Sequence, residues 1–582
     1  METQTHSPLP EGHIRLLAIH PNQDPPSGTL TVVALEDKPN FNALSYAWGD
    51  PGTTLDFSCS GDVLCVHENL ADFLRLASRK YHHRPIWIDA ICINQNDDIE
   101  KNHQIPLMGE IYSNATQVLV WLGTNSEQGD EAFTSIPIIV DGLKHARLEK
   151  STTKYPQQSS YLGIPSRTSP VWLNIGEIFT RSWFHRLWVM QKVYQSSNIK
   201  LLFGLGVVEW EVFVFFVAAL YDGHIEAAVV FEMANGEGVG AGLDLTRSLV
   251  ILKSDRVSGI KNESFKLSHL LGSIRGRSVT KPVDKFYGFL AIMPPNIQRL
   301  LTVDVNLSAA RVYTAFAKCL LQCGYASVVF SLASDSLEGL PSWCPSLAEA
   351  STTVLLGRTS FSEHSFRAGY EVHLSGKERV KVLHDCDTIK AVGFEVDVVL
   401  ETLGSKSAFD SAKTMLEWDK ACLDKAKRYY DSSKYDIMLQ DLCEARIAGY
   451  RLEFDLRDCP PRHPSVWTQD CKYWSFEAQH RQEPGVYSSR AYRFFSSARW
   501  GSKGRCFFIT KGKSMGSGPA AAQAGDSVCI LYGRPTPFIL RRNPSQSRYR
   551  LIGEAYVNGV MDGEAFELRD KHSLPDQTFV IK

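Results

Sequence analysis

The sequence predicts an α/β domain with a mostly parallel sheet, followed by a helical middle and a β-rich C-terminal region. Strand-like and helix-like segments alternate through the first third of the chain. Two of its runs, RPIWIDAICI (84–93) and TQVLVWLG (116–123), are continuously apolar. Such runs are typical of strands buried on both faces of a parallel sheet. By contrast, residues 339–582 hold short β-like runs separated by turns.

Local signals predict the elements of the α/β domain. TLTVVAL (29–35) and NALSYAWG (42–49) indicate strands because they are rich in β-branched and aromatic residues. A helix is expected to begin near Asn69, which suits an N-cap, with apolar residues at helical spacing from Leu70. The next helix is predicted from acidic residues that suit a first turn, namely Asp97, Asp98 and Glu100.

Beyond residue 124 the pattern changes several times. The polar stretch 125–168 is interpreted as an insertion or a mobile loop, and FHRLWVMQKVYQ (184–195) as one helix. IKLLFG (199–204) indicates a further strand, and residues 208–338 are mainly helical in pattern. The C-terminal runs RCFFITKG, DSVCILYG, PFILRR and YRLIGEAYV are spaced as in a small β sandwich or barrel.

Composition excludes several classes of protein. With 62 basic and 64 acidic residues the net charge is -2, so no nucleic-acid partner is expected. The most apolar run, 208–221, carries two glutamates and is shorter than the ~20 residues of a membrane span. The 13 cysteines lack paired spacing, and the N-terminus lacks the pattern of a secretory signal. These features predict a cytoplasmic protein without a membrane span.

No motif indicates a metal or a resident cofactor. Cys459, His463, Cys471 and His480 lie close in sequence, but their spacing matches no common zinc pattern. The chain also lacks a GxSxG elbow, an HExxH helix and a P-loop. We therefore expect no metal site.

Four tryptophan-containing strings carry the polar residues of interest. They are ALSYAWGD (43–50), IWIDAICINQND (86–97), YSNATQVLVWLG (112–123) and RSWFHRLWVMQK (181–192). Asp89 is expected at the carboxyl end of a strand, where its carboxylate either meets a ligand or holds the backbone of the next loop. Tyr46 and Trp48 are either core aromatics or platforms for a ligand.

These strings resemble, in order from about residue 42 to 204, the heterokaryon-incompatibility (HET) domain of filamentous fungi. The resemblance extends to RGRSVTKPVDKFYGFLAI (275–292), LSAARVYTAFAKCLL (307–321) and the tail 516–566. It therefore covers nearly the whole chain. The expected divisions are an N-terminal segment (1–41), the HET domain (42–207), a helical region (208–338) and the β-rich region (339–582).

The resemblance implies a role in fungal nonself recognition. Proteins of this family trigger growth arrest and programmed cell death when genetically unlike hyphae fuse. Their N-terminal domain is similar to Toll/interleukin-1 receptor (TIR) domains, a flavodoxin-like fold that signals by self-assembly and in some members hydrolyses NAD. The implied partners are other proteins, either incompatibility partners or further copies of this chain. NAD is implied only as a substrate or ligand.

The resemblance also implies which residues line a site. The family pattern is approximately R-x-W-x-x-Q-E, and this chain has Arg186, Trp188 and Gln191 followed by Lys192. The full set of family-motif residues expected at the site is Tyr46, Trp48, Gly49, Asp89, Cys92, Gln95, Arg186, Trp188, Gln191 and Lys192.

Lys192 decides which chemistry we expect. In TIR-type NAD hydrolysis a glutamate on the corresponding helix engages the nicotinamide ribose, where an anion stabilises the positive charge that develops on the sugar. An ammonium repels that charge and accepts no hydrogen bonds. The expected function is therefore signalling without catalysis, and an NAD-hydrolysing effector is the alternative. On one continuous helix, Lys192 would lie on a polar, partly solvated face with Arg181 and His185.

Overall fold

The computed structural model divides into two compact units. The first comprises Met1–Lys261 and Arg277–Leu307, and the second comprises Asn262–Gly276 and Ser308–Lys582. The structure describes residues 6–582 except for 50–51, 125–126, 149–162, 167–168, 222–238, 259–266, 268–269, 275–276, 278, 334–338, 348–355, 357–365, 371–379, 384–386, 405–411, 431, 449–463 and 481–487.

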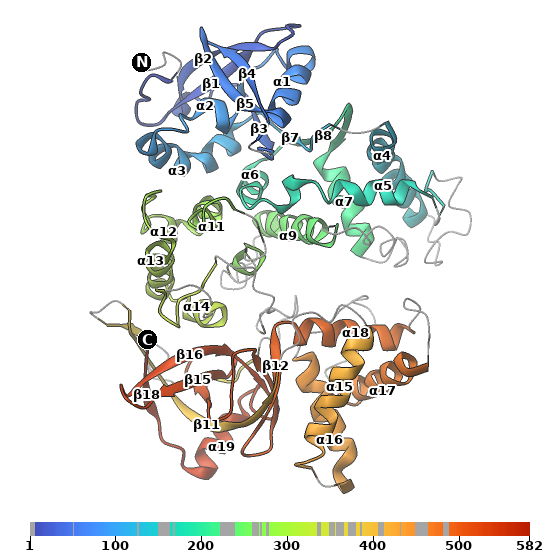
Figure 1. Ribbon diagram of the computed structural model, residues 1–582, viewed down its shortest axis with the longest axis vertical. Helices are drawn as coiled ribbons and strands as arrows, with labels where there is room; N and C mark the ends of the chain where they lie inside the picture. Colours follow the sequence, from blue (N-terminus) through green and yellow to red (C-terminus); the bar gives the residue numbers. More distant parts are fainter. Residues whose placement is uncertain are drawn as a thin grey trace. The chain divides into compact units, whose positions relative to one another are not determined.

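A mixed sheet forms the centre of the first unit, with the order β5-β4-β2-β1-β6-β3-β7-β8-β9 (Figure 1). Its central strands β6, β3, β7 and β8 are parallel, whereas β1–β2, β4–β5 and β8–β9 are antiparallel pairs. The bounds are β1 His13–Ile19, β2 Ser27–Ala34, β3 Asn42–Tyr46, β4 Thr54–Cys59, β5 Asp62–His67, β6 Ile86–Trp87, β7 Gln117–Trp121, β8 Ile199–Phe203 and β9 Gly206–Glu209.

The predicted parallel sheet is thus correct for the centre of the sheet only. Helical crossovers join the central strands, which makes them parallel, whereas short connections join the outer pairs and make them antiparallel. Residues 1–41 contribute β1 and β2, and β1 pairs with both β2 and β6. The predicted N-terminal segment is therefore an integral part of this sheet.

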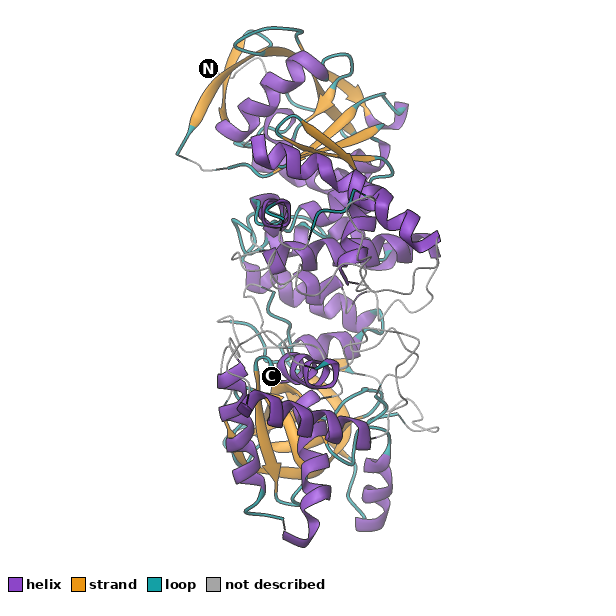
Figure 2. Cartoon of the chain, turned by 90° about the vertical axis from the view of Figure 1, so that its right-hand side faces the viewer, coloured by secondary structure: helices purple, strands orange, loops and turns teal. Residues whose placement is uncertain are grey.

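Helices lie beside the sheet of the first unit (Figure 2). The predicted apolar stripe of α1 is confirmed, because Leu70, Phe73, Leu74 and Ala77 are buried. The described helices are α1 Glu68–Lys80, α2 Asp89–Cys92, α3 Asp98–Asn114, α4 Glu127–Leu148, α5 Val171–Ile178, η4 Ser182–His185, α6 Val189–Gln195, α7 Trp210–Tyr221, α9 Val239–Ser258, α11 Asp284–Tyr287, η5 Leu290–Ile292 and α12 Pro295–Gln298.

Two predictions about helix starts have different outcomes. The acidic start of α3 is confirmed, because the Asp97 side chain accepts hydrogen bonds from the backbone N–H groups of Ile99 and Glu100. The predicted N-cap at Asn69 is wrong. His67 occupies that position without a side-chain bond, and Asn69 Nδ2 instead donates to the Ala47 carbonyl at 2.6 Å.

Three element assignments also differ from the structure. The strand predicted over 84–93 is limited to β6, because the chain turns into α2 at Asp89. Part of the predicted loop 125–168 is the helix α4, whereas residues 149–162 lie outside the described residues. The segment 184–195 is not one helix. The 3-10 turn η4 ends before Arg186, whose φ of -83° and ψ of 139° are extended, and α6 begins at Val189.

The second unit contains a closed ring of strands, as the turn-spaced β runs predicted. The long strand β11 pairs with β18, β14 and β12 along its length, and β14–β15–β16–β18 completes a circuit back to β11. The bounds are β10 Lys381–Val382, β11 Ile389–Leu403, β12 Arg505–Thr510, β13 Met515–Pro519, β14 Ser527–Leu531, β15 Phe538–Asn543, β16 Arg548–Glu554, β17 Tyr556–Val557 and β18 Gln577–Ile581.

A layer of helices that the sequence reading missed packs against this ring (Figure 1). Its core joins Trp474 and Phe494 on the helices to Phe507 and Met515 on the strands. The described helices of the second unit are α13 Ala309–Gln322, α14 Ala326–Leu332, α15 Ala412–Ala426, η7 Ser432–Lys434, α16 Tyr435–Ile447, α17 Pro464–His480, α18 Ser489–Ser502 and α19 Glu564–His572.

Candidate functional site

The candidate site lies where β3 and β6 end. These strands are parallel neighbours, with Asn42 opposite Ile86 and Ala43 opposite Trp87. Their carboxyl ends therefore meet at the same edge of the sheet, where ligand sites of α/β sheets are usually found. Tyr46 is the last residue of β3 and Trp48 follows that strand, while Asp89 follows β6.

A buried ion pair joins Lys192 of α6 to Asp89 of α2. Lys192 Nζ lies 3.0 Å from Asp89 Oδ2, and the two side chains are only 3% and 13% exposed. The ammonium also lies 5.3 Å from the centre of the Tyr112 ring. Burial lowers the pKa of Lys192, while the neighbouring Asp89 carboxylate opposes that shift. The predicted partly solvated Lys192 is therefore wrong, because α6 starts late and turns this side chain inward.

Asp89 holds the backbone of the following turn, which is one of the two roles that the sequence left open, and it also pairs with Lys192. Oδ1 accepts a hydrogen bond from the backbone N–H of Ala90 at 2.8 Å, while Oδ2 faces Lys192. The Asp89 carbonyl accepts a bond from Gln95 Nε2, also at 2.8 Å. One carboxylate thus holds the start of α2 and neutralises the cation opposite.

Tyr46 and Trp48 differ in burial although they are two residues apart. Tyr46 is 2% exposed, and its hydroxyl has no hydrogen-bond partner within the described part of the chain. Burial, followed by the Asp89 charge, raises the pKa of Tyr46 well above its usual value. Trp48 is half-buried, and the Arg186 guanidinium lies 5.8 Å from the centre of its ring. Tyr46 is thus a core residue, whereas Trp48 and Arg186 form a partly accessible cation–π pair.

Gly49 follows Trp48 in a backbone conformation that favours glycine. Its φ is +88°, in the left-handed region. A Cβ added at Gly49 would meet the Asn69 Cβ at 3.5 Å, which is an ordinary contact. The requirement for glycine is therefore conformational rather than steric.

Asp284 brings a second carboxylate to this site. The Trp188 side chain donates a hydrogen bond to Asp284, and the Arg186 charge acts on the same carboxylate. Burial nevertheless raises the pKa of Asp284. The segment 275–292 contributes to the family resemblance, but the sequence predicted no role for Asp284. The missed signal was a single acidic residue at the start of the aromatic helix α11.

The remaining family-motif residues are Cys92, Gln95 and Gln191, and they hold the elements of the site in place. Cys92 is buried, its Sγ lies 3.3 Å from the backbone nitrogen of Ile88, and burial raises the pKa of its thiol to about 12. Such a thiol stays protonated and is a poor nucleophile. Gln191 is buried with Nε2 3.8 Å from Met108 Sδ, which links α6 to α3. Cys92, Gln95 and Gln191 therefore position the elements that carry Asp89 and Lys192.

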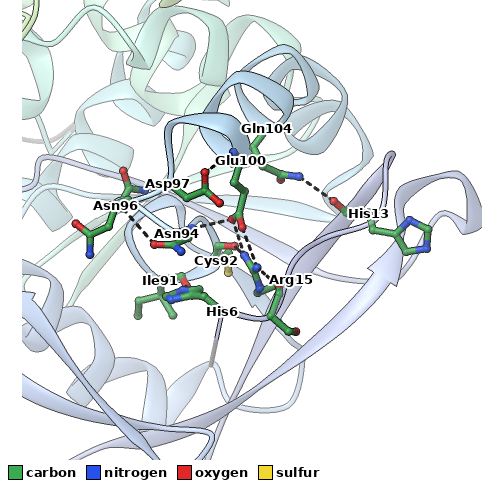
Figure 3. Close-up of polar contacts among 12 residues, drawn as sticks. His6, His13, Arg15, Ile91, Cys92, Asn94, Asn96, Asp97, Glu100 and Gln104 are labelled. Atoms are coloured by element: carbon green, nitrogen blue, oxygen red, sulfur yellow. Dashed lines mark hydrogen bonds and ion pairs between the residues drawn. The ribbon is translucent and has the colours of Figure 1, made fainter. Parts of the chain in front are cut away.

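A second buried ion pair anchors the loop between α2 and α3 (Figure 3). Arg15 Nη1 and Nη2 donate to Glu100 Oε1 at 2.6 Å and Oε2 at 2.9 Å, and Nη1 also donates to the Cys92 carbonyl at 3.0 Å. Glu100 Oε1 additionally accepts from the backbone N–H of Asn94 at 2.7 Å. The side chains are 1% and 7% exposed. No sequence motif indicated this pairing, because 85 residues separate its members.

The described residues limit the chemistry of this arrangement. They contain no cluster of three or more histidine, cysteine or acidic side chains suited to a metal ion, while Cys459 and His463 lie outside them. Within the same residues, no helix combines the length and apolarity required to cross a bilayer. The site instead presents two carboxylates, each beside a cation or a donor, together with the half-buried pair of Trp48 and Arg186.

Comparison with known proteins identifies the class. Residues 41–192 match the family described as heterokaryon incompatibility protein (HET), and residues 478–574 match the Het-6 beta-barrel domain. The first range contains β3, β6, β7 and most of α6, and the second contains most of the closed ring. The chain is therefore similar to HET-domain proteins over the first range and to the Het-6 barrel over the second.

A named relative matches along almost the whole length. The chain is 25% identical to heterokaryon incompatibility protein 6, OR allele, of Neurospora crassa, over 97% of this chain and 96% of that protein. The similarity therefore includes both domains and the helices between them. No solved structure matches the chain.

Proposed function

We propose that this chain acts in fungal heterokaryon incompatibility as a nonself-recognition protein that signals through protein–protein assembly and triggers growth arrest or cell death. The HET domain and the Neurospora crassa relative support this role. The parallel strands β6, β3, β7 and β8 support relating the first unit to TIR-like, flavodoxin-like domains. The described cysteines form no disulfide, which favours the cytoplasm as the place of action.

The observation that carries a signalling role without catalysis is the ion pair of Lys192 and Asp89. NAD hydrolysis requires an unpaired carboxylate against the sugar as positive charge develops there. Lys192 places an ammonium at that position and occupies Asp89 at 3.0 Å. The other carboxylate of the site, Asp284, accepts a bond from Trp188 and lies near Arg186. Neither carboxylate is free to stabilise an oxocarbenium ion.

The half-buried Trp48–Arg186 pair supplies a recognition surface in this proposal. A guanidinium over an indole ring leaves polar N–H groups available at its rim. Such a surface suits contact with a carboxylate or an aromatic group of another protein. In this proposal the ion pair of Lys192 and Asp89 keeps the fold of a TIR-like site but does not support NAD hydrolysis.

The test separates signalling from catalysis. Wild-type full-length chain, expressed from an inducible promoter in a fungal host, is expected to arrest growth while NAD stays at the level of an uninduced culture. Purified wild-type chain is expected to leave NAD intact over hours. Multiple turnovers of NAD per chain would overturn the signalling role in favour of the NAD-hydrolysing alternative. Absence of growth arrest would refute the effector role.

Two variants sharpen this test. Lys192→Glu restores the family carboxylate, and Lys192→Glu with Asp89→Lys reverses the pair while keeping its net charge. Lys200→Gln, which removes a partly exposed lysine of β8, is the matched control. If the Lys192 charge alone blocks hydrolysis, Lys192→Glu gains NAD turnover and the control does not. Equal turnover in wild type and Lys192→Glu would contradict the role assigned to this position.

A further inference from the structure

Two cysteines of the second unit contact one another across a helix–helix interface. Cys443 lies on α16 and is 1% exposed, and Cys471 lies on α17 at the edge of the same core. The two side chains are joined by a hydrogen bond. The helices themselves pack together. Two thiols in contact on neighbouring elements satisfy the first geometric requirement for a disulfide.

The surroundings make the two thiols unequal. The bond from Cys443 lowers the pKa of Cys471 most strongly, and Arg446, Ser475 and Lys472 lower it further. Burial raises the pKa of Cys443 well above its usual value. Arg446 is itself buried, and its Nη2 has no hydrogen-bond partner among the described residues. Its Nη1 forms an ion pair with Asp419, and the same guanidinium acts on the Cys471 thiol.

In other cysteines of the chain the thiol pKa is raised rather than lowered. Burial raises the pKa of Cys59 to about 11 and that of Cys344 to about 12, so both stay protonated. Cys422, in the same helical layer, is also shifted upward by burial. Among the described cysteines with a shifted pKa, Cys471 is the one shifted downward. It thus combines partial exposure, adjacent cations and a second thiol, the features of a reactive cysteine.

We propose that Cys443 and Cys471 form a peroxide-sensitive dithiol that closes to a disulfide between α16 and α17. The Cys471 thiolate attacks one oxygen of hydrogen peroxide, forms a sulfenic acid and releases hydroxide. The Cys443 thiol then attacks the sulfenic sulfur, the S–S bond forms, and the sulfenic oxygen leaves as water. Overall, two thiols and one peroxide yield one disulfide and two waters.

Closure would tie together the helices that pack on the barrel. α16 contacts β13 and α18, and Trp474 of α17 lies in the shared core. The bond would close the chain between residues 443 and 471 and restrict the unfolded state. Oxidation is therefore expected to stabilise the helical layer. This inference is independent of the proposed function, because it concerns the second unit and requires no NAD chemistry.

The test is peptide mapping of the reduced full-length chain after brief exposure to equimolar hydrogen peroxide, with remaining thiols alkylated. The expected product is a linked peptide pair containing Cys443 and Cys471. Cys65, an exposed cysteine of β5, is the internal reference. Cys471 is expected to lose its reactivity toward alkylation at least about tenfold faster than Cys65 during peroxide exposure. Equal rates, or linkage of Cys471 to another cysteine such as Cys459, would overturn the proposal.

Variants assign the roles of the two thiols. Cys443→Ser is expected to stop at a sulfenic acid on Cys471 that dimedone traps, and Cys471→Ser is expected to leave Cys443 unoxidised. Cys422→Ser, a buried cysteine of the same layer, is the matched control and should still form the linkage. Oxidation of Cys443 in Cys471→Ser would refute the assigned order. The wild-type map remains decisive if a variant fails to fold.

Discussion

The two buried ion pairs of the first unit use different chemistry in neighbouring places. Arg15 meets both oxygens of Glu100 and a backbone carbonyl, and Glu100 also accepts a backbone N–H. Lys192 meets one oxygen of Asp89, and its other close neighbour is an aromatic ring. A planar guanidinium fixes geometry through several bonds, whereas an ammonium acts as a point charge. We infer that the first pair anchors the loop and that the second tunes the site.

The largest loss of folding stability is expected when the ion pair of Arg15 and Glu100 is broken. Glu100→Gln leaves the Arg15 charge buried without a counter-charge, which costs about 3–5 kcal/mol. Hydrogen exchange is expected to accelerate in peptides covering 94–114. Glu209→Gln in the exposed pair with Lys200 is the control, with a cost below about 1 kcal/mol. Similar costs for the two variants would remove the distinction between anchor and surface pair.

A smaller loss of folding stability is expected when the ion pair of Lys192 and Asp89 is broken. Asp89→Asn leaves Lys192 without its anion and costs about 2 kcal/mol at neutral pH, because the buried ammonium loses a charged hydrogen-bond acceptor. Burial already lowers the pKa of Lys192, and loss of Asp89 lowers it further. The unfolded chain then binds more protons between that lowered pKa and 10.5, so stability rises with pH in this window.

Urea unfolding of Asp89→Asn at several pH values above neutrality checks this dependence. The stability deficit relative to wild type is expected to shrink as the pH rises, because Lys192 of the folded variant loses its proton at a lower pH than Lys192 of the folded wild type. A deficit that stays constant with pH would show that Lys192 carries no charge in the wild-type site.

The hydrogen bond from Trp188 to Asp284 of α11 is expected to contribute less to folding stability than either ion pair. Trp188→Phe removes the donor to Asp284 and costs about 1.5 kcal/mol. Because that bond lowers the pKa of Asp284, Asp284 keeps its proton to a higher pH in the variant than in wild type. A folded-state pKa above the unfolded value means that stability falls as pH rises through it. Thermal unfolding should therefore show a larger deficit at pH 7 than at pH 4, and Trp210→Phe serves as a tryptophan control.

The smallest expected effect is at the turn that carries Trp48. Gly49→Ala is expected to cost about 1 kcal/mol, because a non-glycine residue at a φ of +88° is strained. Gly12→Ala, at a φ of +70° with open space around it, is the matched control and should cost a similar amount. A much larger cost at Gly49 would indicate that the ring of Trp48 is displaced.

Part of the site could be predicted from the sequence because the signals are local. Asp89 and Lys192 are both among the residues expected at the site, Asp89 from its place at a strand end and Lys192 from the family pattern, and they form an ion pair. The late start of α6 was not predictable from periodicity. FHRLWVMQKVYQ has helical spacing throughout, yet Arg186 is extended and breaks the helix. The inward direction of Lys192 follows from that break.

Sequence alone determined several of the strands and turns and one apolar helix face, because those depend on neighbouring residues. It placed the central parallel strands, the stripe of α1 and the β runs of the barrel. Tertiary structure decided the pairing of Arg15 with Glu100, the approach of Asp284 to Trp188 and the contact of Cys443 with Cys471. These contacts join residues far apart in the chain, so only the packing of complete elements brings them together and sets the charge each one meets.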